Sequence, residues 1–184
     1  MRVGLAHGAS GTVASMRPHV VALARRRIDA FAIGLPRGRA EAAIPAFRAA
    51  VLESGTTVAD TIIGGQSYGG RVASLLAADE QPTGLVLFSY PLHRPGQPEW
   101  EPRTEHWPRL KCPVLLLSGE ADPFARIELL RLAVTRLTRA ELVSYPRVGH
   151  GLGPVLDDAM DRVAEFVSSL VADGRAVATG PPPR

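Results

Sequence analysis

Cysteine, lysine and aromatic side chains are all scarce in this sequence of 184 residues. Cysteine occurs once, at Cys112, which excludes an internal disulfide and disfavours a thiolate metal site. Lysine also occurs once, at Lys111, and the other basic residues are dispersed arginines that leave a net charge of only +3. Because there is no basic stripe interleaved with aromatic residues, the composition argues against nucleic-acid binding.

Long apolar runs are missing as well. None approaches the roughly 20 residues of a membrane-spanning helix, and Met1 leads directly into strand-like sequence without a secretory leader. We therefore expect a cytoplasmic protein with no membrane partner. The hydrophobic share of 46% suffices for one compact domain, which we predict over residues 1–173. Residues 174–184, which include three prolines, are predicted to form a disordered tail.

Short apolar runs alternate with amphipathic segments along the chain. The expected strands are 3–6, 28–33, 58–63, 84–88, 114–117 and 142–145. The expected helices are 13–24, 39–54, 70–78, 125–137 and 155–171. This alternation predicts an α/β fold, a three-layer sandwich in which a mainly parallel sheet of about six strands carries helices on both faces.

The stretch Gly65-Gln66-Ser67-Tyr68-Gly69 joins the third expected strand to the third expected helix. A G-x-S-x-G pattern in this setting is typical of a nucleophile elbow. The turn is sharp, so small residues must flank it. We therefore predict that Ser67 is held at the carboxyl end of a strand as a nucleophile.

A nucleophilic serine needs a base, and an acid that orients the base. In this topology the acid and then the histidine follow the serine along the chain. His150, between two glycines after the last strand, is the predicted base. Asp122 and Glu120 both follow the fifth strand, and Asp122 is favoured, although its place before Pro123 also fits a helix cap.

An oxyanion hole requires two N–H donors. The backbone N–H of Tyr68 is one predicted donor, and the other is expected from the loop after the first strand, with Ala9 favoured over Ser10. The alternative is that the stretch 7–11 is only a glycine-rich turn that caps a helix. A phosphate-binding loop is disfavoured because the sequence lacks both G-x-G-x-x-G and a Walker lysine.

The whole pattern resembles the α/β-hydrolase superfamily. It resembles more closely the small dienelactone-hydrolase-related branch that includes the testis-expressed and NSL-complex subunit relatives. The segments that carry the resemblance are Leu5-Ala6-His7-Gly8-Ala9-Ser10-Gly11, Gly64 to Arg71, Ser89-Tyr90-Pro91-Leu92-His93, Arg103 to Pro108, Leu117 to Phe124 and Gly149-His150.

The resemblance implies a triad of Ser67, Asp122 and His150 that works without metal or cofactor. It also implies that further side chains line or support a substrate pocket, namely His7, Tyr90, His93, Arg103 and His106. The chain begins at what the superfamily counts as its third strand, so a truncated fold without the first two strands is expected. The short insertion before the fifth strand predicts that there is no large cap.

These features predict a serine hydrolase for a small or medium carboxylic ester or thioester. The alternatives are a non-catalytic interaction module with a vestigial triad and an acyltransferase. Strand 28–33 is expected at a sheet edge, where unpaired backbone groups invite association. We predict that the tail covers this edge or that a second copy pairs with it in a symmetric homodimer.

Overall fold

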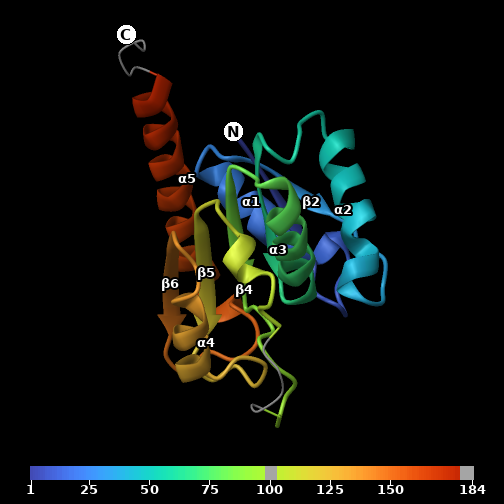
Figure 1. Ribbon diagram of the computed structural model, residues 1–184, viewed down its shortest axis with the longest axis vertical. Helices are drawn as coiled ribbons and strands as arrows, with labels where there is room; N and C mark the ends of the chain where they lie inside the picture. Colours follow the sequence, from blue (N-terminus) through green and yellow to red (C-terminus); the bar gives the residue numbers. More distant parts are fainter. Residues whose placement is uncertain (98–102, 179–184) are drawn as a thin grey trace.

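The computed structural model describes residues 1–97 and 103–178. In chain order the elements are β1 (Arg2–Ala6), η1 (Val13–Met16), α1 (Arg17–Arg25), β2 (Asp29–Ile33), α2 (Ala40–Glu53), β3 (Thr61–Gln66), α3 (Tyr68–Glu80), β4 (Gly84–Phe88), η2 (Trp107–Arg109), β5 (Val114–Gly119), α4 (Ile127–Val134), β6 (Ala140–Tyr145), η3 (Gly153–Val155) and α5 (Leu156–Ala178). The six strands form one parallel sheet in the order β2-β1-β3-β4-β5-β6, which confirms the predicted fold class (Figure 1).

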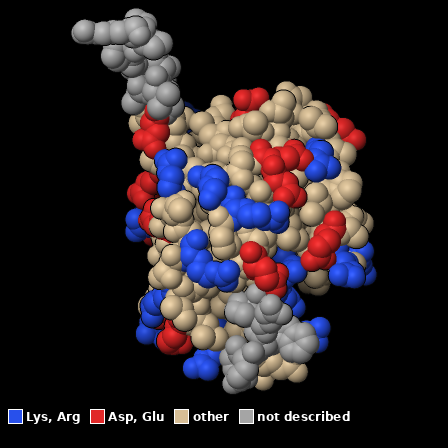
Figure 2. Space-filling view, in the orientation of Figure 1, with Lys and Arg blue, Asp and Glu red and all other residues tan. Residues whose placement is uncertain are grey.

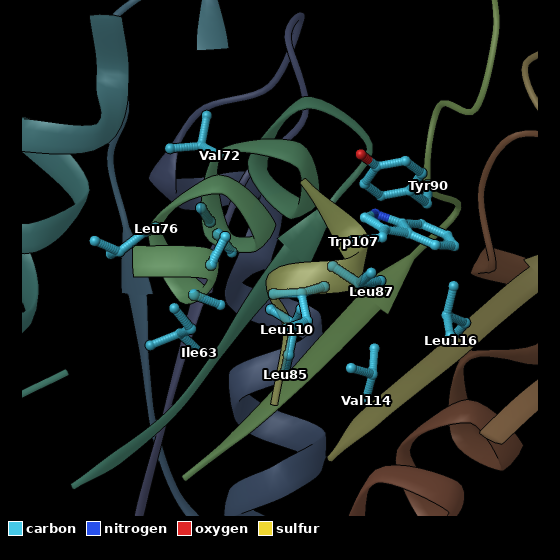
Figure 3. Close-up of a cluster of buried hydrophobic side chains, with 14 of the residues drawn as sticks. Ile63, Val72, Leu76, Leu85, Leu87, Tyr90, Trp107, Leu110, Val114 and Leu116 are labelled. Atoms are coloured by element: carbon cyan, nitrogen blue, oxygen red, sulfur yellow. The ribbon is translucent and has the colours of Figure 1, made fainter. Parts of the chain in front are cut away.

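Helices cover both faces of this sheet. Residues of α2, α3 and α4 share one apolar core, and residues of α1 and α5 share the other. Successive side chains of a strand point to opposite faces, so Leu85 and Leu87 of β4 enter the first core while Val86 and Phe88 enter the second. Figure 3 shows the first core, where Leu85 and Leu87 lie among side chains from β3, β5 and α3. Each fully buried leucine stabilises the fold by about 1.5–3 kcal/mol.

The third strand starts later than the sequence predicts. Thr57 and Asp60 form a tight turn, in which Thr57 Oγ1 donates to Asp60 Oδ2 at 2.6 Å and accepts the Asp60 N–H at 3.2 Å. β3 therefore begins at Thr61 rather than Val58, and it continues through both glycines to Gln66. The strand thus delivers its last residue directly to Ser67.

The predictions for the edge strand and for the C-terminal segment have different outcomes. β2 is an edge strand, as predicted, while its cover by the tail or its pairing with a second copy stays a prediction. Helix α5 continues to Ala178, so the first five residues of the predicted tail are helical, and residues 179–184 lie outside the described part. Within the described residues, no helix has the length and apolar character needed to span a membrane.

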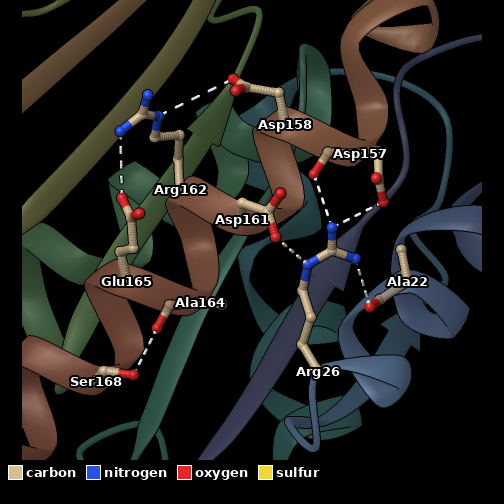
Figure 4. A network of polar contacts seen from close by, with 9 residues as sticks. All are labelled: Ala22, Arg26, Asp157, Asp158, Asp161, Arg162, Ala164, Glu165 and Ser168. Atoms are coloured by element: carbon tan, nitrogen blue, oxygen red, sulfur yellow. Dashed lines mark hydrogen bonds and ion pairs between the residues drawn. The ribbon is translucent and has the colours of Figure 1, made fainter.

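Arg26 ties the end of α1 to α5, as Figure 4 shows. Its guanidinium donates to the carboxylates of Asp161 and Asp157, both at 2.7 Å, and to the Ala22 carbonyl at 3.0 Å. The hydrogen bonds that Arg26 donates to Asp161 and Asp157 raise the pKa of Arg26 above its ordinary value. This network fixes the helix that follows the His150 loop against the rest of the domain.

Candidate active site

Ser67 occupies a strained turn between β3 and α3. Its backbone has φ 50° and ψ −114°, a conformation that costs about 1–3 kcal/mol for a residue with a side chain. Two hydrogen bonds hold it there: the Ser67 N–H donates to the Phe88 carbonyl at 2.8 Å, and the Ser67 carbonyl accepts from the Arg71 N–H at 3.0 Å. The side chain is thereby fixed at the carboxyl edge of the sheet.

Glycines allow the backbone around this turn to pack closely. A Cβ on Gly65 or on Gly69 would lie 2.4 Å from the carbonyl oxygen of Ala6. A Cβ on Gly64 would lie 2.1 Å from the carbonyl oxygen of Val86. Any side chain at these positions would push α3 or β3 away from its neighbours, which is the physical reason for the glycines around the serine.

The structure brings together Ser67, His150 and Asp122, which come from three separate loops. Ser67 Oγ lies 2.9 Å from His150 Nε2, and His150 Nδ1 lies 2.9 Å and 2.8 Å from the two carboxylate oxygens of Asp122. The side chain of Asp122 is fully buried, whereas that of His150 is 21% exposed. Because Nδ1 must donate to the carboxylate, Nε2 is the ring atom that can accept the serine proton.

Asp122 is itself oriented by the loop that follows β5. Its Oδ1 accepts the N–H of Phe124 at 2.8 Å, and its backbone carbonyl accepts the N–H of Ala125 at 3.2 Å. Asp122 does not cap the following helix, as the sequence also allowed, because α4 begins at Ile127 and its N-cap is Arg126. The ring of Phe124 lies 4.3 Å from the imidazole of His150, a contact that the sequence reasoning did not anticipate because nothing in the spacing distinguishes this phenylalanine.

Glu120, the alternative acid, is engaged elsewhere. Its Oε1 accepts hydrogen bonds from Ser144 Oγ at 2.7 Å and from the guanidinium of Arg131 at 3.0 Å. These two contacts place the side chain of Glu120 in a surface network between β6 and α4.

His7 and His93 each use both ring nitrogens to hold backbone. In His7, Nε2 accepts the N–H of Leu35 at 3.1 Å while Nδ1 donates to the Gly8 carbonyl at 2.8 Å. In His93, Nε2 accepts the N–H of Arg126 at 3.0 Å while Nδ1 donates to the Arg94 carbonyl at 2.8 Å. Both rings are buried, so this geometry fits the support of neighbouring loops better than contact with a substrate.

Tyr90 and His106 lie deeper than the sequence suggests. Tyr90 is 1% exposed, donates to the Arg103 carbonyl at 2.5 Å and packs edge-on against Trp107. His106 is 5% exposed and lies with its Nε2 2.8 Å from Ser74 Oγ. Burial lowers the pKa of His106 to about 4. Among the predicted pocket residues, Arg103 lines a cavity at the N-termini of α2 and α3.

The two predicted oxyanion donors belong to segments that meet at the serine elbow. Tyr68 is the first residue of α3, so its backbone N–H has no acceptor within the helix. The loop that carries Ala9 approaches the elbow closely, since a Cβ on Gly8 would lie 3.7 Å from Ser67 Cβ. In the described part of the chain, no group of three or more His, Cys, Asp or Glu side chains has the arrangement of a metal site.

A parallel sheet with a serine elbow at the end of its third strand defines the hydrolase-like α/β class of proteins. Residues 35–168, well over half of the chain, match the family of the alpha/beta hydrolase domain. The chain therefore belongs to this family, and its membership supports a hydrolase function.

Solved structures with the same fold include known esterases and lipases. The monoacylglycerol lipase of Paleococcus ferrophilus is 16% identical, with a TM-score of 0.77 over 91% of this chain and 94% of the lipase. Est1E from Butyrivibrio proteoclasticus is 19% identical, with a TM-score of 0.74 over 92% of this chain and 88% of Est1E. A thermophilic esterase from Thermogutta terrifontis is 18% identical, with a TM-score of 0.72 and coverages of 94% and 90%. At these identities the likeness concerns the fold.

Proposed function

We propose that this protein is a serine hydrolase that cleaves a small or medium carboxylic ester or thioester. The observation that carries the proposal is the continuous hydrogen-bonded chain from Ser67 Oγ through the imidazole of His150 to the buried carboxylate of Asp122. A carboxylate fixed against Nδ1 holds the tautomer in which Nε2 is a base, and it stabilises the imidazolium that forms when the serine proton is taken.

In the first half of the reaction, His150 Nε2 removes the proton of Ser67 Oγ as that oxygen attacks the ester carbonyl carbon. The backbone N–H groups of Tyr68 and Ala9 are proposed to stabilise the resulting oxyanion. The tetrahedral intermediate then collapses, the bond to the leaving oxygen or sulfur breaks, and the imidazolium protonates the leaving group. The product is an acyl-enzyme on Ser67.

In the second half, His150 takes a proton from water, and the hydroxide attacks the acyl carbon. Collapse of the second intermediate returns the proton to Ser67 Oγ and releases the carboxylic acid. No cofactor or metal takes part in these steps. An acyltransferase would use the same acyl-enzyme with a different acceptor in place of water, and an interaction module would leave Ser67 unreactive. Membership in the dienelactone-hydrolase-related branch stays a prediction.

Fluorophosphonate labelling tests the proposal, because the probe reacts with activated serines. Ser67→Ala is expected to abolish labelling and to lower kcat on the best member of an ester panel by roughly 10⁴-fold or more. Ser74→Ala is the matched control, since Ser74 is also hydrogen-bonded to a histidine and lies on the helix that follows Ser67. Labelling that persists in Ser67→Ala, or that disappears in Ser74→Ala alone, would refute the assignment.

A further inference from the structure

The proposed triad has an uncharged neighbour to which the reaction steps assign no role. Basic and acidic side chains are intermingled over the face of the molecule in Figure 2, so the charge of this face does not single out one region. The ring of Phe124, by contrast, has its centroid 4.3 Å from that of the His150 imidazole, and the two ring planes meet at 39°. Aromatic pairs usually have centroids about 4.5–7 Å apart, so this contact is a close one.

The backbone of Phe124 is held on both sides. Its N–H donates to Asp122 Oδ1 at 2.8 Å, and its carbonyl accepts the N–H of His93 at 3.0 Å. Two residues further on, the N–H of Arg126 donates to His93 Nε2 at 3.0 Å. The buried side chain of His93 therefore ties the loop after β4 to the loop after β5. The ring of Phe124 projects from a backbone that these contacts restrain.

The backbone around His150 is less crowded. Gly149 and Gly151 flank the histidine, and glycine has more conformational freedom than other residues. A Cβ on Gly149 would find its nearest neighbour, the carbonyl oxygen of Ala121, only at 4.0 Å, so close packing is not the reason for the missing side chain. The orientation of the imidazole therefore depends on the contacts that the ring itself makes.

The hydrogen bonds of His150 do not by themselves fix the plane of its ring. They restrain the two nitrogens, with Nε2 2.9 Å from Ser67 Oγ and Nδ1 2.8 Å from Asp122 Oδ2. The ring still has freedom to turn about the line through these atoms. Such a turn swings the Nδ1–H bond and the lone pair of Nε2 away from their partners, and hydrogen bonds weaken steeply when they are bent. A side chain packed against the imidazole limits this turn.

The chemistry of phenylalanine suits this task. Its ring has no hydrogen-bonding group, so it does not compete with Ser67 or Asp122 for either nitrogen of His150. An aromatic ring also attracts a cation that lies over its face within about 6 Å. Contact with Phe124 is therefore compatible with both the neutral imidazole and the imidazolium that forms during the proposed reaction.

We propose that Phe124 is a positioning residue, whose ring fixes the plane of the His150 imidazole so that Nδ1 faces Asp122 and Nε2 faces Ser67. This inference rests on the proposed serine hydrolase function. Phe124 acts through His150 and itself takes up and releases no proton. It contributes to acylation and deacylation alike, because His150 transfers a proton in both halves of the proposed reaction.

Steady-state kinetics on p-nitrophenyl butyrate provide the first test. Phe124→Ala is expected to lower kcat by about 10-fold to 100-fold, because misplacement of a reacting group by about 1 Å costs up to about 10²-fold. The value of KM should stay within about 3-fold of the parent, since binding before the proton transfer is unaffected. Phe124→Tyr keeps the ring and should restore kcat to within about 3-fold of the parent.

Phe31→Ala is the matched control for a general loss of packing. Phe31 is also half-buried, but it lies on the edge strand β2, with its ring centroid 5.1 Å from Arg2 Cζ. Its kcat per folded molecule should equal that of the parent. If Phe124→Ala fails to fold, Phe124→Leu replaces it, because leucine keeps an apolar side chain without a ring, and the same direction of change is expected.

A small probe distinguishes positioning from contact with the substrate. The rate constant for labelling of Ser67 by diisopropyl fluorophosphate should fall in Phe124→Ala by a factor similar to that for kcat, and it should recover in Phe124→Tyr. In the His150→Ala background, Phe124→Ala should lower the remaining kcat no further. An increase confined to KM, with the labelling rate unchanged, would show that Phe124 lines the substrate site and would overturn the proposal.

Proton NMR of the free protein needs no turnover and separates this inference from the proposed function. The proton that Nδ1 of His150 donates to the Asp122 carboxylate should give a resonance far downfield of the backbone amides. This resonance is expected to broaden or vanish in Phe124→Ala and to persist in Phe124→Tyr and Phe31→Ala. That pattern with an unreactive Ser67 refutes the hydrolase function and supports the positioning role. An unchanged resonance and an unchanged kcat in Phe124→Ala overturn the positioning role even if Ser67 is labelled.

Discussion

Two serine–histidine pairs, one directly before helix α3 and one within it, have almost the same length and opposite hydrogen-bond directions. Ser67 Oγ lies 2.9 Å from His150 Nε2, and Ser74 Oγ lies 2.8 Å from His106 Nε2. In the second pair Ser74 donates its proton to the Arg71 carbonyl at 2.9 Å, so His106 Nε2 must be the donor to Ser74. In the first pair the tautomer is reversed, because Asp122 holds the proton on Nδ1 and leaves Nε2 as an acceptor.

The comparison shows that a short serine–histidine distance does not by itself fix which of the two groups donates the hydrogen bond. Ser67 has a strained backbone, a partly exposed base and a carboxylate behind that base. Ser74 is fully buried within regular helix, and among the described residues His106 has no carboxylate as a hydrogen-bond partner. The direction of the hydrogen bond, set by the third residue, distinguishes the two pairs.

The largest expected effect separates the two histidines. His150→Ala is expected to lower kcat by about 10⁴-fold to 10⁶-fold, because it removes the group that we propose accepts and returns the proton. The loss in a Ser67→Ala/His150→Ala double variant should be no greater than that of either single variant. His106→Ala serves as the control, and turnover per folded molecule should remain within a few-fold of the parent, as measured with an active-site titrant.

The next effect concerns the carboxylate that sets the tautomer. Asp122→Asn is expected to lower kcat by roughly 10⁴-fold, because an amide in place of the carboxylate stabilises the wrong tautomer of His150. Glu120→Gln should change kcat by less than about 3-fold, since exposed pairs such as that with Arg131 contribute little. Steady-state kinetics on one ester compare Asp122→Asn with Glu120→Gln. A larger loss of kcat in Glu120→Gln would reverse the assignment of the acid.

A smaller effect concerns the stability of the fold and two histidines, His106 and His19. Their burial disfavours the charged form of the ring. Burial lowers the pKa of both His106 and His19 to about 4. The unfolded chain, with histidine pKa values near 6.5, binds these protons more tightly than the folded protein. Their neutral forms stabilise the fold above pH 6.5, and this stability is expected to decline as the pH falls from about 6.5 towards 4.

Urea unfolding at pH 7.0 and pH 5.0 measures that decline. In His106→Gln the difference between the two midpoints should be smaller than in the parent protein. A parent midpoint that is the same at both pH values would show that these two rings titrate in the folded state as they do in the unfolded chain.

The smallest effect, on stability alone, is expected far from both serine–histidine pairs, at the contact of α1 with α5 shown in Figure 4. Arg26→Gln removes hydrogen bonds to Asp157 and Asp161 and should lower the urea midpoint slightly without changing kcat. Arg162→Gln is the control, because Arg162 is more exposed, with 44% of its side chain accessible against 16% for Arg26. Added salt should reduce the difference in urea midpoint between the parent protein and Arg26→Gln, since salt screens exposed charges.

The strand and helix sequence was predictable because its signal is local. Apolar runs such as Gly84–Phe88 match the structure in both bounds, while β3 was placed three residues early because the Thr57–Asp60 turn interrupts an apolar run. The predicted order of serine, acid and histidine identified three residues that the structure brings within hydrogen-bonding distance. The cavity lined by Arg39, Arg71 and Arg103 was not foreseen, because Arg39 directly precedes α2 and Arg71 lies on α3, and their spacing carries no pattern.

By itself, the sequence determined the alternation of strands and helices and the positions of polar residues at the ends of strands, because hydrophobic periodicity and turn chemistry act over a few residues. Only the tertiary structure decided which of the five histidines has a carboxylate on one ring nitrogen and a serine on the other. It also decided which histidines bind backbone groups instead, and which arginines lie close together. The reason is that hydrogen-bond direction and burial depend on residues distant in the chain, and these are fixed only when the sheet and its loops assemble.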